Sequence, residues 1–348
     1  MHRNRHIQKV FGTLPTSDDV ADGTRGLRIS LSVFKNGKFL RYVDMFRKVV
    51  LVFTFLIFQG CQVYSRGVLT VTCIDVGQGD AVLLAFPNGK VWLVDAGGTP
   101  AGDTEAGTDQ GHRNVLPVLR AKAIQSLDVV VMTHPDEDHI QGMLAIARHV
   151  PVGRVYWNGF PGSRTEQRVR KQFQQRGTQV ELLTAGSMTH VGDVDVHVLS
   201  PPAKPILGTR SPENENSIVL LLKYGSKAIL LTGDVEAAGE QRLLSTSRLE
   251  LRNLSLLKVA HHGSDSSSTP EFVRWTHPQI ALISCGKRNR YGHPSKDVLK
   301  RFERIGTELY RTDECGMIEW SSNGQTEAIS TMLPCNENAP RNAQGVQN

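Results

Sequence analysis

The chain has 348 residues, of which 39% are hydrophobic and 21% are charged. These values fit one large globular domain or two ordinary ones, and they exclude a disordered or fibrous protein. The formal net charge is +6, but residues 1–60 contain ten Lys and Arg against four Asp, so that the remaining 30 basic and 30 acidic residues cancel. Net charge therefore does not indicate a polyanionic partner.

Residues 1–44 are of mixed polar character and show no sustained periodicity. Met45 opens a different pattern, in which two cations precede an almost wholly apolar run at 49–58, followed by Gly60 and Cys61. This is the pattern of a secretory signal, and the apolar run is too short to span a bilayer. We expect Met45 to be the true start, 1–44 to be a doubtful extension and 45–61 to be a signal peptide. The alternative is a buried strand or helix.

The pair Gly60-Cys61 resembles the end of a bacterial lipobox, in which the cysteine becomes lipidated, although Phe58 and Gln59 are not the preferred preceding residues. We expect an exported protein of the cell envelope. It is either a lipoprotein held at the membrane through Cys61, or a periplasmic, extracellular or membrane-anchored protein.

The five cysteines contain no CxxC pair, which argues against a zinc ribbon and against a dithiol redox motif. A disulfide among the later ones, Cys285, Cys315 and Cys335, requires an exported domain. The sequence leaves the pairing open.

From residue 67 to 333 short apolar runs alternate with turn signals and helical patterns. Strands are predicted at 68–74, 81–86, 91–94, 129–132, 152–156, 179–183, 194–199, 217–224, 228–231, 254–260 and 280–284, and near 309, 318 and 329. Helices are predicted at 115–123, 142–149, 166–176, 236–249, 272–276 and 295–305. The two similar halves predict an α/β domain over 67–333, with paired sheets flanked by helices. Residues 334–348 are expected to be a disordered tail.

One motif, His134-Pro135-Asp136-Glu137-Asp138-His139, directly follows the apolar run at 127–132. It places two histidines and two non-adjacent aspartates in six residues of a predicted loop. Imidazole and carboxylate are the usual ligands of Zn²⁺ and Mn²⁺, and a loop allows residues two apart to converge on one ion. The motif therefore predicts metal binding. The alternative is a solvated polar turn that leads into a helix.

Further polar groups of the metal-binding kind stand at the ends of other predicted strands: Asp95, Asn214-Glu215-Asn216, Asp234 and His261-His262. Taken singly, Asp234 could cap the following helix and His261-His262 could belong to an ordinary turn. Their recurrence at strand ends favours one shared site.

These motifs resemble the metallo-β-lactamase fold and, within it, the extracytoplasmic hydrolase domain of ComEC-type DNA-uptake proteins, here in a stand-alone form. The resemblance spans about 67–333 and rests on seven stretches in order, at 75–81, 93–97, 133–139, 216–220, 231–234, 261–264 and 289–294. It implies an αββα sandwich of two mixed sheets with a two-metal site between the sheet edges. At Asp136 most members of the wider superfamily carry histidine. A carboxylate there makes the site harder and shifts it from Zn²⁺ toward Mn²⁺ without excluding zinc.

The resemblance and the ligand chemistry together assign two divalent ions, Zn or Mn. The first would be held by His134 and Asp136, the second by Asp138 and His139, with Asp234 bridging both. His261 would complete the second site. The remaining candidates are His262 as the substitute for His261, Asn216 near the first ion, and Asp75, Asp80 and Asp95 as groups that orient the histidines. For Asp75 and Asp80 the alternative is turn formation with the adjacent glycines.

Catalytic roles are expected for Asp138, Asp234 and His293. His293 lies in a separate Gly-His-Pro loop, where it could donate a proton to the leaving oxygen or grip the phosphate, or serve only the turn. The three cations just before it are expected to bind phosphates without reading bases, unless they merely form a solvated turn. They are Lys287, Arg288 and Arg290.

The leading hypothesis is an exported two-metal phosphodiesterase that degrades one strand of DNA by attack of a metal-activated hydroxide. A second hypothesis keeps the fold but changes the substrate to a small phosphorylated or β-lactam-like molecule. A third, from another class, is a surface lipoprotein that binds metal without catalysis.

Overall fold

The computed structural model describes residues 67–98, 109–248 and 250–335. The expected extension at 1–44 and the expected signal at 45–61, including Cys61, lie outside these residues. Within the described part of the chain, no helix combines the length and apolar character that a membrane span requires.

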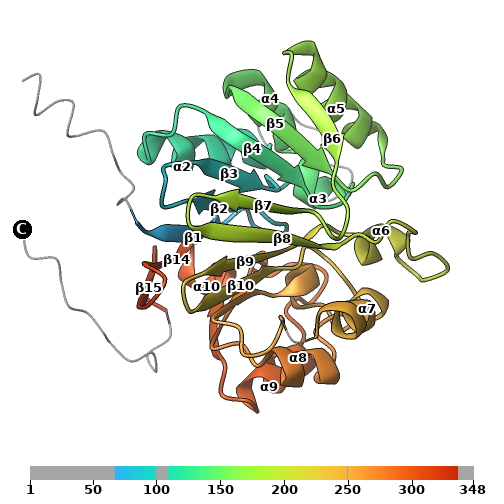
Figure 1. Ribbon diagram of the computed structural model, residues 1–348, viewed down its shortest axis with the longest axis vertical. Coiled ribbons are helices and arrows are strands. Elements are labelled where there is room, and N and C mark those ends of the chain that lie inside the picture. Colours follow the sequence, from blue (N-terminus) through green and yellow to red (C-terminus); the bar gives the residue numbers. More distant parts are fainter. Residues whose placement is uncertain (1–66, 99–108, 249, 336–348) are drawn as a thin grey trace, which may run out of the picture. The chain divides into compact units, whose positions relative to one another are not determined.

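Two mixed β-sheets of eight and seven strands face each other (Figure 1). The order of the first sheet is β15-β14-β1-β2-β3-β4-β5-β6, and that of the second is β13-β12-β11-β10-β9-β8-β7. The strands of the first sheet are β1 (Leu69–Cys73), β2 (Val82–Ala85), β3 (Val91–Val94), β4 (Leu127–Met132), β5 (Val152–Trp157), β6 (Gln179–Leu182), β14 (Ile318–Ser322) and β15 (Glu327–Thr331). Those of the second are β7 (Met188–Val191), β8 (Val194–Ser200), β9 (Val219–Tyr224), β10 (Lys227–Leu231), β11 (Leu256–Lys258), β12 (Ile280–Ile283) and β13 (Glu308–Arg311).

Helices cover the outer face of each sheet (Figure 1). The first sheet carries α2 (Leu116–Ala121), α4 (Met143–His149) and α5 (Arg164–Gln175), with a π-helical turn at Gly111–Val115 before α2. The second carries α7 (Ala237–Ser247), α8 (Pro270–Thr276) and α9 (Lys296–Glu303). Three short helical segments, α3 (Glu137–Ile140), α6 (Pro212–Glu215) and α10 (Thr312–Cys315), and a 3₁₀ turn at Ala260–Gly263 complete the described part. The predicted αββα sandwich is confirmed.

Strand direction sets where the polar motifs meet. β3 to β6 run parallel in the first sheet, and β10 to β13 run parallel in the second. The carboxyl ends of neighbouring parallel strands lie at one edge of a sheet, where sites of α/β proteins form. The segments that follow β3, β4, β10, β11 and β12 therefore converge.

Two local predictions were wrong. The strand expected at 254–260 is limited to Leu256–Lys258, because the chain then turns through left-handed conformations at His261 (φ 48°) and His262 (φ 55°). A further strand, β7, precedes β8 and pairs with it as a hairpin. Cys335 forms a disulfide with Cys315, and the rest of the tail expected over 334–348 lies outside the described residues.

The largest apolar cluster fills the space between the sheets, and Trp320 is its largest fully buried side chain. We expect Trp320→Ala to lower the free energy of unfolding by about 3–5 kcal/mol, because it leaves a large cavity that the two sheets cannot close. The measurement is urea unfolding of the full chain followed by circular dichroism, with Trp320→Phe as the control that keeps most of the volume. A loss below about 1 kcal/mol for the alanine variant would contradict this account of the core.

Candidate metal centre

Asp95 follows β3 and links the end of this strand to the end of β4 through hydrogen bonds. Its carboxylate accepts hydrogen bonds from the backbone N of Thr133 (2.9 Å) and from the Thr133 hydroxyl (2.6 Å). The same carboxylate lies 2.8 Å from Nδ1 of His139. Asp95 is 1% exposed. It therefore fixes both the start of the motif and the ring of its last histidine, which leaves Nε2 of that ring directed away from Asp95.

The motif is not the loop that the sequence predicted, because Glu137 to Ile140 form the short helix α3. Asp136 precedes the helix in an extended conformation, and its carboxylate makes no capping hydrogen bond. The backbone of Asp138 accepts a hydrogen bond from Asp80 N (3.3 Å). A Cβ on Gly79, whose φ is +132°, would lie 2.1 Å from the Asp138 carbonyl oxygen. Only glycine therefore permits this close approach.

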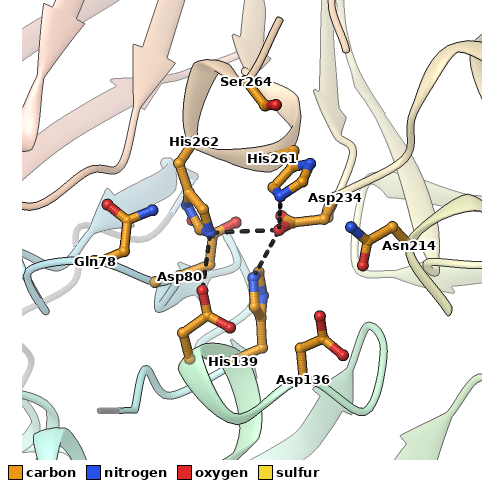
Figure 2. Close-up of polar contacts among 12 residues, drawn as sticks. Gln78, Asp80, Asp136, His139, Asn214, Asp234, His261, His262 and Ser264 are labelled. Atoms are coloured by element: carbon orange, nitrogen blue, oxygen red, sulfur yellow. Dashed lines mark ion pairs between the residues drawn. The ribbon is translucent and has the colours of Figure 1, made fainter. Parts of the chain in front are cut away.

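Asp234 is the central acceptor of the site (Figure 2). Its Oδ2 lies 3.1 Å from Nε2 of His139, 3.3 Å from Nε2 of His262 and 3.9 Å from Nε2 of His261. The Nε2 of His134 lies 4.0 Å away. Asp234 does not cap α7, whose N-cap is Glu236. The sequence alternative of a simple capping aspartate is thus wrong.

The two remaining carboxylates of the motif lie at the edge of this group. Asp138 Oδ2 is 3.4 Å from Nε2 of His262, and Asp136 Oδ2 is 3.7 Å from Nε2 of His134. The Asp136 side chain is 41% exposed, whereas that of His134 is buried. The arrangement brings together imidazole and carboxylate atoms from both sheets.

Several buried polar atoms at this place have no hydrogen-bond partner among the described residues. They are Nε2 of His134, His139 and His262, Oδ1 of Asp234 and Oδ1 of Asp80. Leaving such atoms unpaired costs about 1–3 kcal/mol each, so an additional group that satisfies them is expected. Three imidazole nitrogens and carboxylate oxygens form a donor set suited to Zn²⁺ or Mn²⁺. The residues therefore fit divalent ions.

The two adjacent histidines have different surroundings. His262 is 1% exposed, its Nδ1 lies 3.0 Å from the carbonyl oxygen of Ser284 and 3.3 Å from Asp80 Oδ1, and its Nε2 faces the centre. His261 has a side chain 23% exposed, and its Nδ1 lies 3.1 Å from Glu236. The ligand atoms of Asp80, His139, Asp234 and His262 all lie within 4.8 Å of one another. The geometry thus favours His262 over His261, the reverse of the sequence preference.

Asp80 belongs to that group by distance, but its second oxygen is already engaged. Asp80 Oδ2 lies 2.8 Å from Nζ of Lys258, which is 2% exposed and also donates to the carbonyl oxygen of Val259. Burial raises the pKa of Asp80, but Lys258 and His262 outweigh it and hold the pKa well below its ordinary value. The charged Asp80 is therefore placed to orient His262, as histidine ligands require.

Two of the predicted residues have their side chains engaged in local hydrogen bonds. The amide of Asn216 holds the preceding loop, through Ile206 and Pro212, and its role near the first ion stays a prediction. Its neighbour Asn214 is the one directed toward the cluster (Figure 2), and its buried Oδ1 has no hydrogen-bond partner in the described part. Asp75 accepts a hydrogen bond from Gly77 N (3.1 Å), which corresponds to the turn alternative.

His293 lies on the loop after β12, with its ring centroid 5.5 Å from that of His261 and 6.4 Å from that of His262. Its Nδ1 is buried without a hydrogen-bond partner among the described residues. Lys287, Arg288 and Arg290 precede it on the same loop and are exposed. The three cations are thus open to solvent on the loop that carries His293.

A pocket of about 520 Å³ opens beside the cluster. Its lining includes Asp136 and Asp138 of the motif, Phe160 from the segment between β5 and α5, Glu213 of α6 and Tyr291 from the loop after β12. These side chains come from four separate segments of the chain, and the tertiary fold brings them together.

Sequence reasoning also missed Lys258 and Glu236. Lys258 is the last residue of an otherwise apolar strand, and a cation in such a run is rarely buried unless it is paired. The single cation in an apolar strand was therefore the signal from which a buried ion pair could have been predicted. Glu236 had no comparable signal, because an acidic residue at the start of a helix is common.

A family model described as the metallo-beta-lactamase superfamily matches residues 74–287. The chain belongs to this superfamily. The matched region contains the whole cluster around Asp234 and ends at residue 287, within the loop that carries His293. Membership agrees with the two-sheet architecture and with a hydrolase fold that binds metal ions.

Relatives of this superfamily member include competence proteins. The chain is 33% identical to ComE operon protein 3 of Bacillus subtilis over 76% of its length and 34% of that protein. It is 30% identical to competence protein ComA of Neisseria gonorrhoeae (72% and 32% covered) and 29% identical to recombination protein 2 of Haemophilus influenzae (84% and 33%). The chain spans about a third of the length of these relatives. The predicted resemblance to ComEC-type proteins is confirmed.

Among solved structures, the metallo-beta-lactamase fold protein YhfI from Bacillus subtilis aligns with a TM-score of 0.47 and 11% identity, covering 73% of this chain and 100% of that one.

The charge state of the metal-free centre follows from the ion pairs between its histidines and its carboxylates. Burial lowers the pKa of His139 and His262, but neighbouring carboxylates, Asp234 foremost, outweigh it and raise both well above the ordinary 6.5. Burial likewise raises the pKa of Asp234, but the histidines hold it well below 3.8. The histidines stabilise the metal-free fold fully below pH 6.5, and this contribution is lost as pH rises through their raised pKa values. The contribution of Asp234 is present above pH 3.8 and is lost as pH falls through its lowered pKa.

Metal binding should therefore displace protons. At pH 7 we expect Zn²⁺ to release about two protons per chain from the metal-free protein, because His139 and His262 must become neutral to bind a metal. The apparent affinity should accordingly rise with pH. The measurement is titration in weakly buffered solution with a pH indicator, and His262→Asn should release about one proton fewer. Metal uptake without proton release would show that the ion does not displace protons from these two rings.

Proposed function

We propose that this protein is an exported, metal-dependent phosphodiesterase that acts as a nuclease on single-stranded DNA. The observation that carries the proposal is the set of buried ligand atoms around Asp234 that lack a hydrogen-bond partner among the described residues, with His293 and three exposed cations on the adjoining loop. Relatives named for competence and recombination support DNA as the substrate.

The metal ligands we propose follow the sequence assignment with one revision. His134 and Asp136 would hold the first ion, Asp138, His139 and His262 would hold the second, and Asp234 would be available to both. Bound divalent ions would lower the pKa of water and stabilise charge that develops on a phosphoryl oxygen. His261 moves to the periphery because its side chain is 23% exposed and its Nε2 lies 3.9 Å from Asp234, farther than Nε2 of His139 or of His262.

The chain's own residues orient these ligands. Asp95 accepts from Nδ1 of His139, and the carbonyl oxygen of Ser284 accepts from Nδ1 of His262. Each contact fixes the tautomer in which Nε2 carries the lone pair that a metal requires. The removal of such a partner typically costs tenfold to a hundredfold in metal affinity or activity.

His293 fits the gripping role better than the proton-donating one. Burial, together with the positive charges of His261 and His262, lowers its pKa to about 4. A ring with that pKa is neutral at pH 7 and donates a hydrogen bond without losing its proton. We assign it to the phosphoryl oxygens, and Lys287, Arg288 and Arg290 to neighbouring phosphates, which they would position without reading sequence.

The expected cleavage can be tested directly. The full chain should cut single-stranded DNA in the presence of Mn²⁺ or Zn²⁺, and Asp138→Ala should reduce the rate by on the order of a hundredfold or more, since it removes a proposed ligand. Asp297→Ala, whose side chain is 76% exposed on α9, is the matched control and should cleave normally. Equal cleavage by wild type and Asp138→Ala, or no cleavage with either metal, would refute the nuclease. Hydrolysis of a small phosphodiester alone would favour the small-substrate alternative, and bound metal without any hydrolysis would favour the binding-module alternative.

Export rests on two separate observations. The sequence pattern at 45–61 is that of a signal, and the disulfide between Cys315 and Cys335 requires an oxidising compartment. We propose a location in the cell envelope, with Cys61 as the lipidated residue.

Mass spectrometry of the native N-terminus tests this location. We expect a mature chain that begins at or after Cys61, with the added mass of lipid on that cysteine if it is an anchor. Cys61→Ser should remove the added mass and release the protein from the membrane fraction. A native chain that begins at Met1 and retains 49–58 would contradict export by this signal.

A further inference from the structure

The pocket beside the metal centre contains more than the chemistry of phosphate cleavage requires. It has a volume of about 520 Å³, within the usual range of small-molecule sites, and Asp136 and Asp138 form part of its wall. A substrate phosphate at the centre would therefore have its attached group at the mouth of this pocket. What that group can be follows from the other side chains.

Two aromatic rings line the pocket. Phe160 comes from the segment between β5 and α5, and Tyr291 comes from the loop after β12. Tyr291 is 47% exposed, which is high for a large aromatic side chain. Aromatic faces bind planar rings by stacking, and a nucleobase presents such a face whatever its identity.

The backbone at Phe160 and the ring of Tyr291 are each held by neighbouring groups. The backbone N of Phe160 donates to Asn158 Oδ1 (3.1 Å), and Asn158 in turn donates to the carbonyl oxygen of Asn216 (3.0 Å). The hydroxyl of Tyr291 accepts from Arg290 (2.9 Å), and its ring stacks on that of His293 with centroids 5.7 Å apart. The ring of Tyr291 is thus positioned before any ligand arrives, which reduces the entropic cost of binding.

The charges of the pocket reject a second phosphate. The described residues that line it include four acidic side chains, Asp136, Glu137, Asp138 and Glu213, and no basic one. Glu137 and Glu213 would remain as uncompensated negative charges when metal ions neutralise the two aspartates. The cations of the site stand instead on the segment 287–290. A neutral planar group belongs in the pocket, and further phosphates belong along the cations.

We propose that this pocket is a nucleobase subsite, in which the base next to the scissile phosphate stacks on Tyr291 and packs against Phe160. This inference rests on the proposed function, because it places the scissile phosphate at the metal centre. It adds that the enzyme gains affinity from the base itself. Since stacking tolerates any base, the subsite favours nucleotides over base-free phosphodiesters without selecting a sequence.

The test compares two fluorescein-labelled octamers with identical charge, one of deoxythymidine and one in which every base is absent. Both carry phosphorothioate linkages that resist hydrolysis, and binding to the full chain with Mn²⁺ is followed by fluorescence anisotropy. We expect the wild type to bind the base-containing octamer about tenfold more tightly. Tyr291→Ala combined with Phe160→Ala should bring this ratio close to one, whereas Tyr291→Trp should preserve it. Met188→Ala, which alters an exposed apolar side chain on β7, is the matched control and should leave the ratio unchanged.

The outcomes separate this proposal from the nuclease itself, because cleavage of unmodified single-stranded DNA is measured on the same preparations. Base-selective binding that requires the two aromatic residues supports the subsite even if no cleavage occurs. Cleavage by a wild type that binds both octamers equally leaves the nuclease standing and overturns the subsite. A base preference that survives in the double variant also overturns it, since the bases would then bind elsewhere.

Discussion

The buried carboxylate of Asp234 is the constraint on which the described structure depends most. It follows β10 of one sheet, yet its oxygen Oδ2 lies 3.1 Å from His139, which is positioned by the other sheet. Burying a carboxylate and several imidazoles is costly unless their charges are paired. The site therefore holds the two sheets together electrostatically only while its positive and negative charges balance. In the metal-free protein the positive charge comes from protons on the histidines. In the active protein, as we propose, it comes from divalent ions.

Each sheet supports its own histidine in a different way. On the first, Asp95 holds both Thr133 and His139, so that a single carboxylate fixes strand end and ligand together. On the second, Lys258 and Asp80 stand behind His262, and the buried cation keeps that carboxylate charged. The second arrangement itself joins the sheets, because Asp80 follows β1 whereas Lys258 ends β11. Loss of either support should reorient one ligand rather than remove it.

Much of this could be predicted from sequence because strand ends in a parallel sheet share an edge. The apolar runs located most strands, and the His134–His139 motif located the centre. The choice between His261 and His262 was not predictable, since it depends on two successive left-handed residues that turn the second ring inward. The same holds for the partner of Cys335 and for Phe160 and Tyr291, whose proximity arises only from tertiary packing. Local sequence patterns predict well where strands end, but they do not predict the direction in which a side chain points.

Acidic and basic side chains are distributed unevenly around the site. Beyond residue 60 the chain is neutral overall, but the pocket is lined by acidic side chains such as Glu213, whereas the cations stand on the segment 287–290, which leads to Tyr291 of the pocket wall. A single phosphodiester would make no use of this asymmetry. A polynucleotide would, because its base can enter the aromatic pocket while its following phosphates lie along the cations. A duplex holds its bases paired and stacked, and extracting one costs a few kcal/mol. The same arrangement that accommodates a polynucleotide therefore favours a single strand.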